Sequence, residues 1–208
     1  MRLIGLLSDV HSSPEPVAEA LDIFARAGVD EVFCAGDIAG YRDGVQETVA
    51  LLTACGARSV LGNHDIGYLQ NADPDADDPV ASYLGSLPAY IDTEIEGRRV
   101  YMVHAEPPAA CLGGIRLRDR SGAVQPDRVA HWAQQLNGFA PEVLIVGHTH
   151  QVFAEQVGGT LIVNPGSAPF NYCCAILRLP ELSVQNFALC GRDIKPTWKW
   201  GDHLLPGA

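Results

Sequence analysis

The chain has 208 residues, of which 47% are hydrophobic and 19% charged, an ordinary composition for a globular protein with one full core. Its formal net charge is −11, which argues against binding to nucleic acid or to an anionic membrane, because both require a basic surface. An anionic small ligand stays compatible with this charge, since a bound metal ion reverses its sign locally. The composition therefore leaves small-molecule chemistry open.

The cysteines and the apolar runs indicate the compartment. None of the six cysteines forms a CxxC pair, and the neighbours Cys173 and Cys174 would point to opposite faces of a strand. Cys34 and Cys55 lie in apolar runs, so buried free thiols are expected, as in a reducing cytoplasm. The apolar run at 3–7 is too short for a signal peptide, and no later run reaches transmembrane length. We therefore expect a cytoplasmic protein.

The first 61 residues alternate between apolar runs and segments with helical spacing. The expected elements are strands at 2–8, 31–35 and 57–61 and helices at 14–27 and 45–55. Ser12, with Glu15 three residues later, is the expected cap of the first helix. Because strands that alternate with helices run parallel and connect by right-handed crossovers, this half predicts a parallel sheet.

Hairpins replace this alternation beyond residue 62. The expected elements are hairpins at 90–103, 152–163 and 173–189, a strand at 143–146 and helices at 80–86 and 126–136. The stretch 71–79 holds four aspartates and two prolines and is expected to be a solvated loop, while 107–122 is irregular. Two mixed sheets packed face to face, with helices outside, would bury all these strands in one α/β domain, residues 1–191.

The last stretch, residues 192–208, is expected to be a tail of this domain. It is rich in proline and carries Trp198 and Trp200. Packing onto the protein's own body is the simplest way to bury two indoles. A contact with a partner, or with a second copy in a dimer, is the alternative.

Potential metal ligands follow five of the expected strands. In α/β proteins the carboxyl ends of strands are where ligands bind. The five segments are Asp9-Val10-His11, Gly36-Asp37, Gly62-Asn63-His64-Asp65, His104 and Gly147-His148-Thr149-His150. Five of the seven histidines of the chain fall in these segments. In extended chain, residues two apart point the same way, so Asp9 with His11, and His148 with His150, could each face one centre.

Each segment alone has a purely structural interpretation. Asp9 could cap a helix, Asp37 a loop, and His104 could be a core histidine. The segment 62–65 could be a simple turn, since Gly and Asn tolerate positive φ. Together these interpretations require five independent coincidences, so the five segments predict a metal centre.

In order and spacing these segments resemble the calcineurin-like metallophosphoesterases. The segment Asn164-Pro165-Gly166-Ser167 resembles a loop of their small bacterial and archaeal branch, and the resemblance spans about residues 2–189. The family implies a four-layer α/β/β/α sandwich of two mixed β-sheets flanked by helices. It also implies two divalent ions, Mn, Fe, Zn, Co or Ni, with manganese among the candidates. By motif position, Asp9, His11 and His150 would bind one ion, Asn63, His104 and His148 the other, and Asp37 both.

The resemblance also implies a mechanism. A hydroxide that bridges the two metals attacks phosphorus while the metals hold the phosphoryl oxygens. His64 is not needed as a ligand and is assigned as the proton donor to the leaving oxygen. Asp65 is assigned with it as a residue that holds the His64 ring in its tautomer.

Two departures from the family bear on the substrate. Ala105 stands where the family has glycine, and Glu106 would add negative charge near an incoming phosphate. The loop 38–42 lacks the Asp-Arg-Gly of protein Ser/Thr phosphatases, and Leu61 stands where some branches have arginine. Without paired arginines to clamp a monoester dianion, a phosphodiesterase is favoured. A phosphomonoesterase for a small metabolite or nucleotide, and a non-catalytic scaffold, remain the alternatives.

Overall fold

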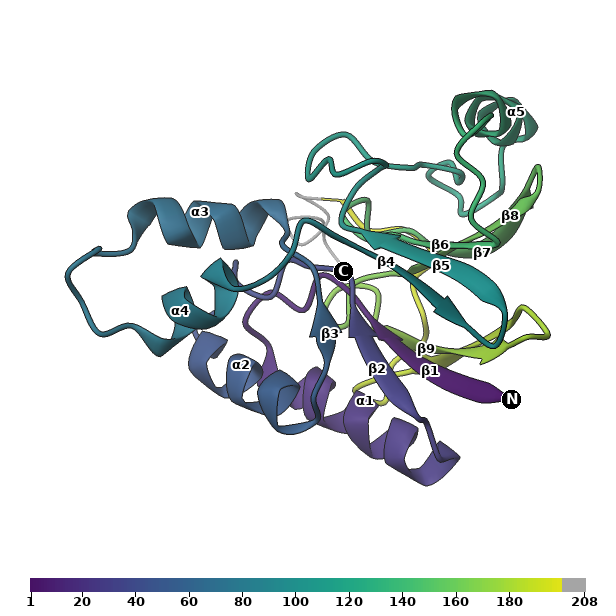
Figure 1. The fold of residues 1–208 in the computed structure, drawn as a ribbon. Helices are drawn as coiled ribbons and strands as arrows, with labels where there is room; N and C mark the ends of the chain where they lie inside the picture. Colours follow the sequence, from purple (N-terminus) through teal and green to yellow (C-terminus); the bar gives the residue numbers. More distant parts are fainter. Residues whose placement is uncertain (200–208) are drawn as a thin grey trace.

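The computed structural model describes residues 1–199 and contains two mixed five-stranded sheets packed face to face (Figure 1). The first sheet has the order β10-β9-β1-β2-β3. Its strands are β1 (Arg2–Leu7), β2 (Glu31–Cys34), β3 (Arg58–Ser59), β9 (Cys173–Leu179) and β10 (Ser183–Ala188). The second has the order β4-β5-β6-β8-β7. Its strands are β4 (Tyr90–Ile95), β5 (Arg98–Val103), β6 (Val143–Ile145), β7 (Val152–Val157) and β8 (Thr160–Pro165).

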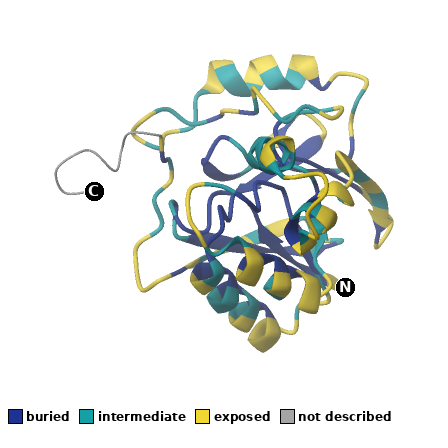
Figure 2. Ribbon diagram, turned by 90° about the vertical axis from the view of Figure 1, so that its left-hand side faces the viewer, coloured by how far each residue is buried: buried dark blue, intermediate teal, exposed yellow. Residues whose placement is uncertain are grey.

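Helices cover the outer faces of both sheets. They are α1 (Pro14–Ala27), α2 (Val45–Ala54), α3 (Asn63–Asn71), α4 (Pro79–Gly85) and α5 (Pro126–Gln135). Figure 1 shows α1 and α2 below the first sheet, α3 and α4 beside β3, and α5 above the second sheet. In Figure 2 the strands are mostly buried, while the helices expose their outer sides. The predicted α/β sandwich is confirmed.

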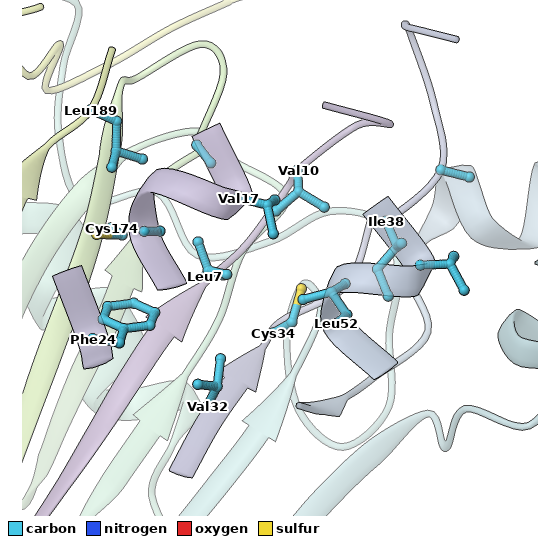
Figure 3. Close-up of a cluster of buried hydrophobic side chains, with 14 of the residues drawn as sticks. Leu7, Val10, Val17, Phe24, Val32, Cys34, Ile38, Leu52, Cys174 and Leu189 are labelled. Carbon is cyan, nitrogen blue, oxygen red and sulfur yellow. The ribbon is translucent and has the colours of Figure 1, made fainter. Parts of the chain in front are cut away.

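Three apolar cores separate these layers. Strand β1 contributes to two of them, because Leu7 faces the helices while Ile4 and Leu6 face the second sheet. Figure 3 shows Leu7 in the helix-side core with Phe24 and Leu52. Burial on both faces explains why this strand is a continuous apolar run. The third core lies under α5 on the outer face of the second sheet.

Several local predictions need correction. The cap of α1 is Ser13, not Ser12, and its hydroxyl donates to the His11 carbonyl instead of to the helix. The third strand is only two residues long, and three residues separate its end from the start of α3 at Asn63. That helix has no apolar stripe, since Asp65 is its only buried residue, so hydrophobic spacing could not reveal it. All six cysteines are unpaired, but Cys55 is exposed where burial was expected.

Residues 195–198 lie along the beginning of β7. The Val152 amide donates to the Pro196 carbonyl, and the Trp198 amide donates to the His150 carbonyl at 3.0 Å. The Trp198 indole stacks on Phe170 with ring centroids 4.2 Å apart. This part of the tail is therefore tied to the strand that follows His150. Trp200 lies outside the described residues, and no helix within residues 1–199 is long and apolar enough to cross a membrane.

Candidate metal centre

The structure brings the five ligand segments together. Asp9 and Asp37 follow β1 and β2 of the first sheet, and His104 and His148 follow β5 and β6 of the second. Asp9, Asp37 and His104 are almost fully buried. A buried carboxylate or imidazole needs a charge partner or hydrogen bonds, so this grouping is not a product of packing alone.

The backbone is left-handed, not extended, at five of the seven candidate ligands. The φ angles are 49° at Asp9, 43° at His11, 53° at Asp37, 62° at His148 and 48° at His150. Asp9 and His11 belong to one group of close donor atoms, whereas His148 and His150 belong to two different groups, and neither pair has the extended backbone that the prediction assumed. A non-glycine residue in this region is strained by about 1 kcal/mol or more and persists only where surrounding contacts fix it. Such strain is typical of functional sites.

Asp9, His11 and His150 form the first ligand group. The Nε2 atoms of His11 and His150 lie 3.1 Å apart. The Asp9 Oδ1 atom is 3.3 Å from His150 Nε2 and 4.0 Å from His11 Nε2. Three donor atoms from two sheets therefore surround one point.

Asn63, His104 and His148 form the second ligand group. The Asn63 Oδ1 atom lies 3.1 Å from His104 Nε2 and 2.9 Å from His148 Nδ1. His104 and His148 also pack edge to face, with ring centroids 5.2 Å apart. The neutral amide of Asn63 thus lies close to a ring nitrogen of each of these two histidines.

The Asp37 carboxylate lies between the two groups. Its Oδ2 atom is 4.0 Å from His11 Nε2 in the first group. Its Oδ1 atom is 3.3 Å from His104 Nε2 in the second. One oxygen therefore faces each group.

The donor atoms fit cations. His104 Nδ1 lies 2.7 Å from the Ala35 carbonyl, to which it can only donate, so its Nε2 atom, which faces the Asn63 oxygen, is the one that holds either the second proton or a metal ion. The Nε2 atoms of His11 and His150 also face each other, so a proton or a metal ion is needed at this contact too. Lone pairs at these distances repel unless a proton or a metal ion lies between them. Imidazole nitrogens with carboxylate and amide oxygens suit divalent transition metals.

The amide of Asn63 has a second arrangement. Turned over, its Nδ2 would donate to His104 Nε2, to His148 Nδ1 and, at 3.2 Å, to the Cys111 carbonyl. That arrangement satisfies the amide when only lone pairs face it. The arrangement with Oδ1 toward the rings is the one that can bind a cation.

Charges in the centre are strongly coupled. Burial opposes the ionisation of Asp9, but the neighbouring His150 holds the pKa of this carboxyl below its usual range. Burial lowers the pKa of His11 to about 3. Burial acts the same way on His104, but the adjacent Asp37 raises the pKa of His104 to about 9. The ligand set thus combines ionised carboxylates with a neutral His11, and a metal ion would displace the proton held by His104.

Two glycines allow the ligand loops to approach closely. A Cβ at Gly62 would overlap the Asp37 side chain, and a Cβ at Gly147 would overlap the Ser8 hydroxyl. The Gly147 position would also lie 2.7 Å from Asp9 Oδ2. Both glycines have φ outside the left-handed region, so they are required for space and not for backbone freedom.

The segment 164–167 supports the ligand loops through hydrogen bonds to their backbone carbonyls. Asn164 Nδ2 donates to the Gly147 carbonyl at 2.9 Å, and Ser167 Oγ donates to the Asp9 carbonyl at 2.6 Å. Asn164 and Ser167 are both fully buried. The segment therefore positions the ligands without contacting the point where they meet.

His64 borders the centre. Its ring stands edge-on to that of His11, with centroids 4.9 Å apart, and its nitrogen lies within 4.8 Å of ligand atoms of His11 and Asp37. Its backbone amide donates to Asp37 Oδ1 at 2.8 Å.

Asp65 is placed differently from the expectation. Its Oδ1 accepts the amides of Ile38 and Ala39, both at 2.8 Å, and its Oδ2 accepts the amide of Gly62 at 2.9 Å. Within the described residues its hydrogen bonds go to backbone amides and not to His64. Burial raises the pKa of Asp65 to about 6, so it is ionised at neutral pH. It joins the loop after Asp37 to the start of α3.

A cavity of about 360 Å³ opens over the centre and contains groups that the motifs did not reveal. Besides ligands and His64 it is lined by Tyr41, Arg116, Thr149, Trp198 and Lys199. Arg116 lies in the stretch 107–122, which has no regular pattern, and Lys199 lies in the tail. The only sequence signal for Arg116 is its place between the apolar Ile115 and Leu117.

Glu106 does not line this cavity, contrary to expectation. Its carboxylate accepts the Gly114 amide at 3.1 Å, and it lines a separate cavity beside α5. Ala105 is fully buried beneath the loop that contains Gly114. Neither departure from the family therefore narrows the cavity over the ligands.

The profile of the calcineurin-like phosphoesterase superfamily domain matches residues 1–178. The chain belongs to this family. This metallophosphoesterase is a metal-dependent hydrolase of phosphoesters, and its family acts on small phosphoester substrates. The resemblance of the ligand segments to this family is confirmed.

The chain is also similar to individual proteins. Phosphodiesterase YfcE of Escherichia coli is 25% identical to this chain over 169 residues, an alignment that covers 80% of this chain and 79% of YfcE. The uncharacterized protein MJ0912 of Methanocaldococcus jannaschii is 27% identical over 180 residues, 79% of this chain and 69% of MJ0912. The hypothetical protein PH1004 of Pyrococcus horikoshii has the same fold, with a TM-score of 0.71 at 18% identity over 94% of this chain and 89% of its own.

Proposed function

We propose that this metallophosphoesterase is a phosphodiesterase with two divalent ions. The observation that carries the proposal is the Asp37 carboxylate, which turns one oxygen toward each of two ligand groups. Asp9, His11 and His150 would hold one ion, and Asn63, His104 and His148 would hold the other. Such a pair of ions would supply Lewis acidity and a water activated at neutral pH. Mn, Fe, Zn, Co and Ni all suit this donor set.

His64 is proposed as the proton donor. The attacking water loses one proton to the solvent as its oxygen bonds to phosphorus, the bond to the leaving oxygen breaks, and that oxygen takes a proton from the His64 ring, which solvent then protonates again. Support comes from its position, since the ring lines the cavity and lies next to His11 and Asp37. A donor at this place neutralises charge as it develops on the leaving group.

Asp65 is proposed as a positioning residue. By accepting the amides of Ile38 and Ala39 it fixes the two residues that follow the bridging Asp37. The Ala39 carbonyl in turn lies 3.3 Å from His11 Nδ1. One buried carboxylate thus supports a ligand of each kind, carboxylate and imidazole.

A diester is favoured over a monoester for two reasons. Leu61 precedes the segment 62–65 where an arginine would clamp a monoester dianion, and the relative YfcE is named a phosphodiesterase. Arg116 and Lys199 at the cavity wall keep a monoesterase as the second candidate. A scaffold without activity is disfavoured, because every expected ligand and His64 converge on one centre.

Metal-reconstituted protein should hydrolyse bis-p-nitrophenyl phosphate faster than p-nitrophenyl phosphate. The reverse order would replace the diesterase by the monoesterase. If neither ester is hydrolysed although two metals are bound, the scaffold is the correct account. A His64→Ala variant should keep both metals and lose most turnover, roughly 10²–10⁴-fold for a lost proton donor. His131→Ala is a matched control on α5, away from the centre.

A further inference from the structure

A basic wall continues from the metal centre. The cavity over the metal ligands and a neighbouring cavity of about 540 Å³ share Arg116 and Lys199 as lining residues. The basic wall is defined by the cations of the second cavity, Arg116, Arg118, Arg120, Arg128 and Lys199. These are five of the 14 lysines and arginines of a chain with 25 acidic residues. Asp119 is the one carboxylate among the lining residues of the described chain.

The metal-ligand loop itself holds this wall in place. Thr149 and Gln151 alternate with the ligands His148 and His150. The Thr149 hydroxyl donates to the Ile115 carbonyl at 3.0 Å. Gln151 Oε1 accepts the backbone amides of residues 117 and 118, both at 3.0 Å. The segment that carries the wall is therefore fixed in register with the ligands.

Gly114 makes the close approach of this segment possible. Its φ is +93°, and a Cβ there would lie 2.8 Å from Thr149 Cγ2 and 3.1 Å from His148 Cδ2. Arg116 follows two residues later, between the fully buried Ile115 and Leu117, and its side chain is exposed. The backbone thus delivers a guanidinium to the boundary between the two cavities.

The cations of the basic wall differ in whether their donors are already used in hydrogen bonds within the protein. Arg118 donates to the carbonyls of Val152 and Gly122 at 2.8 and 2.7 Å, and Arg128 donates to the Arg118 carbonyl at 2.6 Å. These two arginines hold the loop. Arg116 and Arg120 are exposed, and within residues 1–199 neither makes a hydrogen bond or an ion pair. Their guanidinium donors are available to a ligand.

We propose that Arg116 and Arg120 bind a second phosphate group of the substrate while the scissile phosphodiester lies at the metals. The proposal rests on the phosphodiesterase function and names its substrate class, a small phosphodiester with a further phosphate on one arm. Each guanidinium offers paired donors that match phosphate geometry, and two guanidinium groups together suit the double negative charge of a phosphate group. The wall thus gives an acidic protein a local site for a polyanion.

The test uses two chromogenic diesters that differ by one phosphate. They are thymidine 5′-(p-nitrophenyl phosphate) and the same compound with a 3′-phosphate. Metal-loaded wild type should show a KM roughly five- to tenfold lower for the phosphorylated compound, the scale of two exposed charge pairs. The ratio should fall toward one in Arg116→Gln with Arg120→Gln. Arg26→Gln, an exposed site on α1, is the control and should leave the ratio unchanged.

The outcomes separate the possible failures. A ratio near one in wild type, or an equal ratio in the double variant, overturns the second phosphate site and leaves the diesterase standing. If the KM ratio is near one in wild type while inorganic phosphate alters hydrolysis of the unphosphorylated diester in wild type but not in the double variant, the wall binds a free anion and the substrate proposal is wrong. If neither diester is hydrolysed, the diesterase fails. Titration calorimetry then tests the wall, which requires thymidine 3′,5′-bisphosphate to bind wild type more tightly than thymidine 5′-monophosphate.

Discussion

Replacing Asp65 by asparagine separates its positioning role from a catalytic one. The substitution exchanges one carboxylate oxygen for an NH₂ group at a fully buried position. With Oδ1 kept toward Ile38 and Ala39, the new NH₂ group faces the Gly62 amide, so two donors meet. The bonds to residues 38 and 39 remain but are no longer charge-assisted.

The magnitude follows from these three bonds. Each retained bond weakens by about 1 kcal/mol, and leaving the Gly62 amide buried without an acceptor costs about 1–3 kcal/mol. Removing a buried charge, whose cost is visible in the raised pKa of Asp65, offsets part of this. We expect Asp65→Asn to lower the free energy of unfolding by about 2–4 kcal/mol. Asp77→Asn, the same exchange at an exposed site, should change it by less than about 0.5 kcal/mol.

Urea unfolding of the chelator-treated protein measures this difference, and titration calorimetry measures metal affinity. Positioning predicts weaker metal binding in Asp65→Asn, with an unshifted pH profile of turnover at saturating metal. A catalytic Asp65 acting on His64 predicts the opposite, with normal stability and metal affinity but a displaced pH profile. That second pattern would refute the role derived from the three amide contacts.

Other perturbations test the same centre. Gly147→Ala should abolish metal binding and destabilise the fold by about 2–3 kcal/mol, because its Cβ overlaps Ser8; calorimetry and thermal unfolding check both. Asn164→Asp should turn a donor into an acceptor facing the Gly147 carbonyl and weaken metal affinity at least tenfold. The control Asn186→Asp, at an exposed site on β10, should leave metal affinity unchanged. Equal metal affinities in the two variants would contradict a supporting role of Asn164. Removing metals should lower the melting temperature by roughly 5–10 °C, as loss of a ligand held at about 100 times its Kd predicts.

The grouping of the candidate ligands was predictable because metal-binding residue types occur in short segments directly after the expected strands. Asp9, Asp37 and His104 each follow an apolar run, and parallel strands place such ends at one edge of a sheet. Topology therefore brings Asp9 and Asp37 together at the first sheet, and the packing of the second sheet against it adds His104. The conformation of the loops was not predictable, because left-handed φ at Asp9 and His148 is imposed by contacts with other segments.

The walls of the cavity escaped prediction for a different reason. Arg116 lies in an irregular stretch whose position is set by hydrogen bonds to Thr149 and Gln151, and those partners are distant in sequence. The side chain of Glu106 was expected at the substrate, but it is drawn to the Gly114 amide instead. Both outcomes depend on tertiary contacts that no local pattern encodes.

Anomalous scattering from crystals of the metal-loaded protein tests the central claim most directly. The account predicts two peaks about 3.5–4 Å apart on either side of the Asp37 carboxylate. One should lie beside Asp9, His11 and His150, and the other beside Asn63, His104 and His148. A single peak, or two peaks without Asp37 between them, would contradict a dinuclear centre.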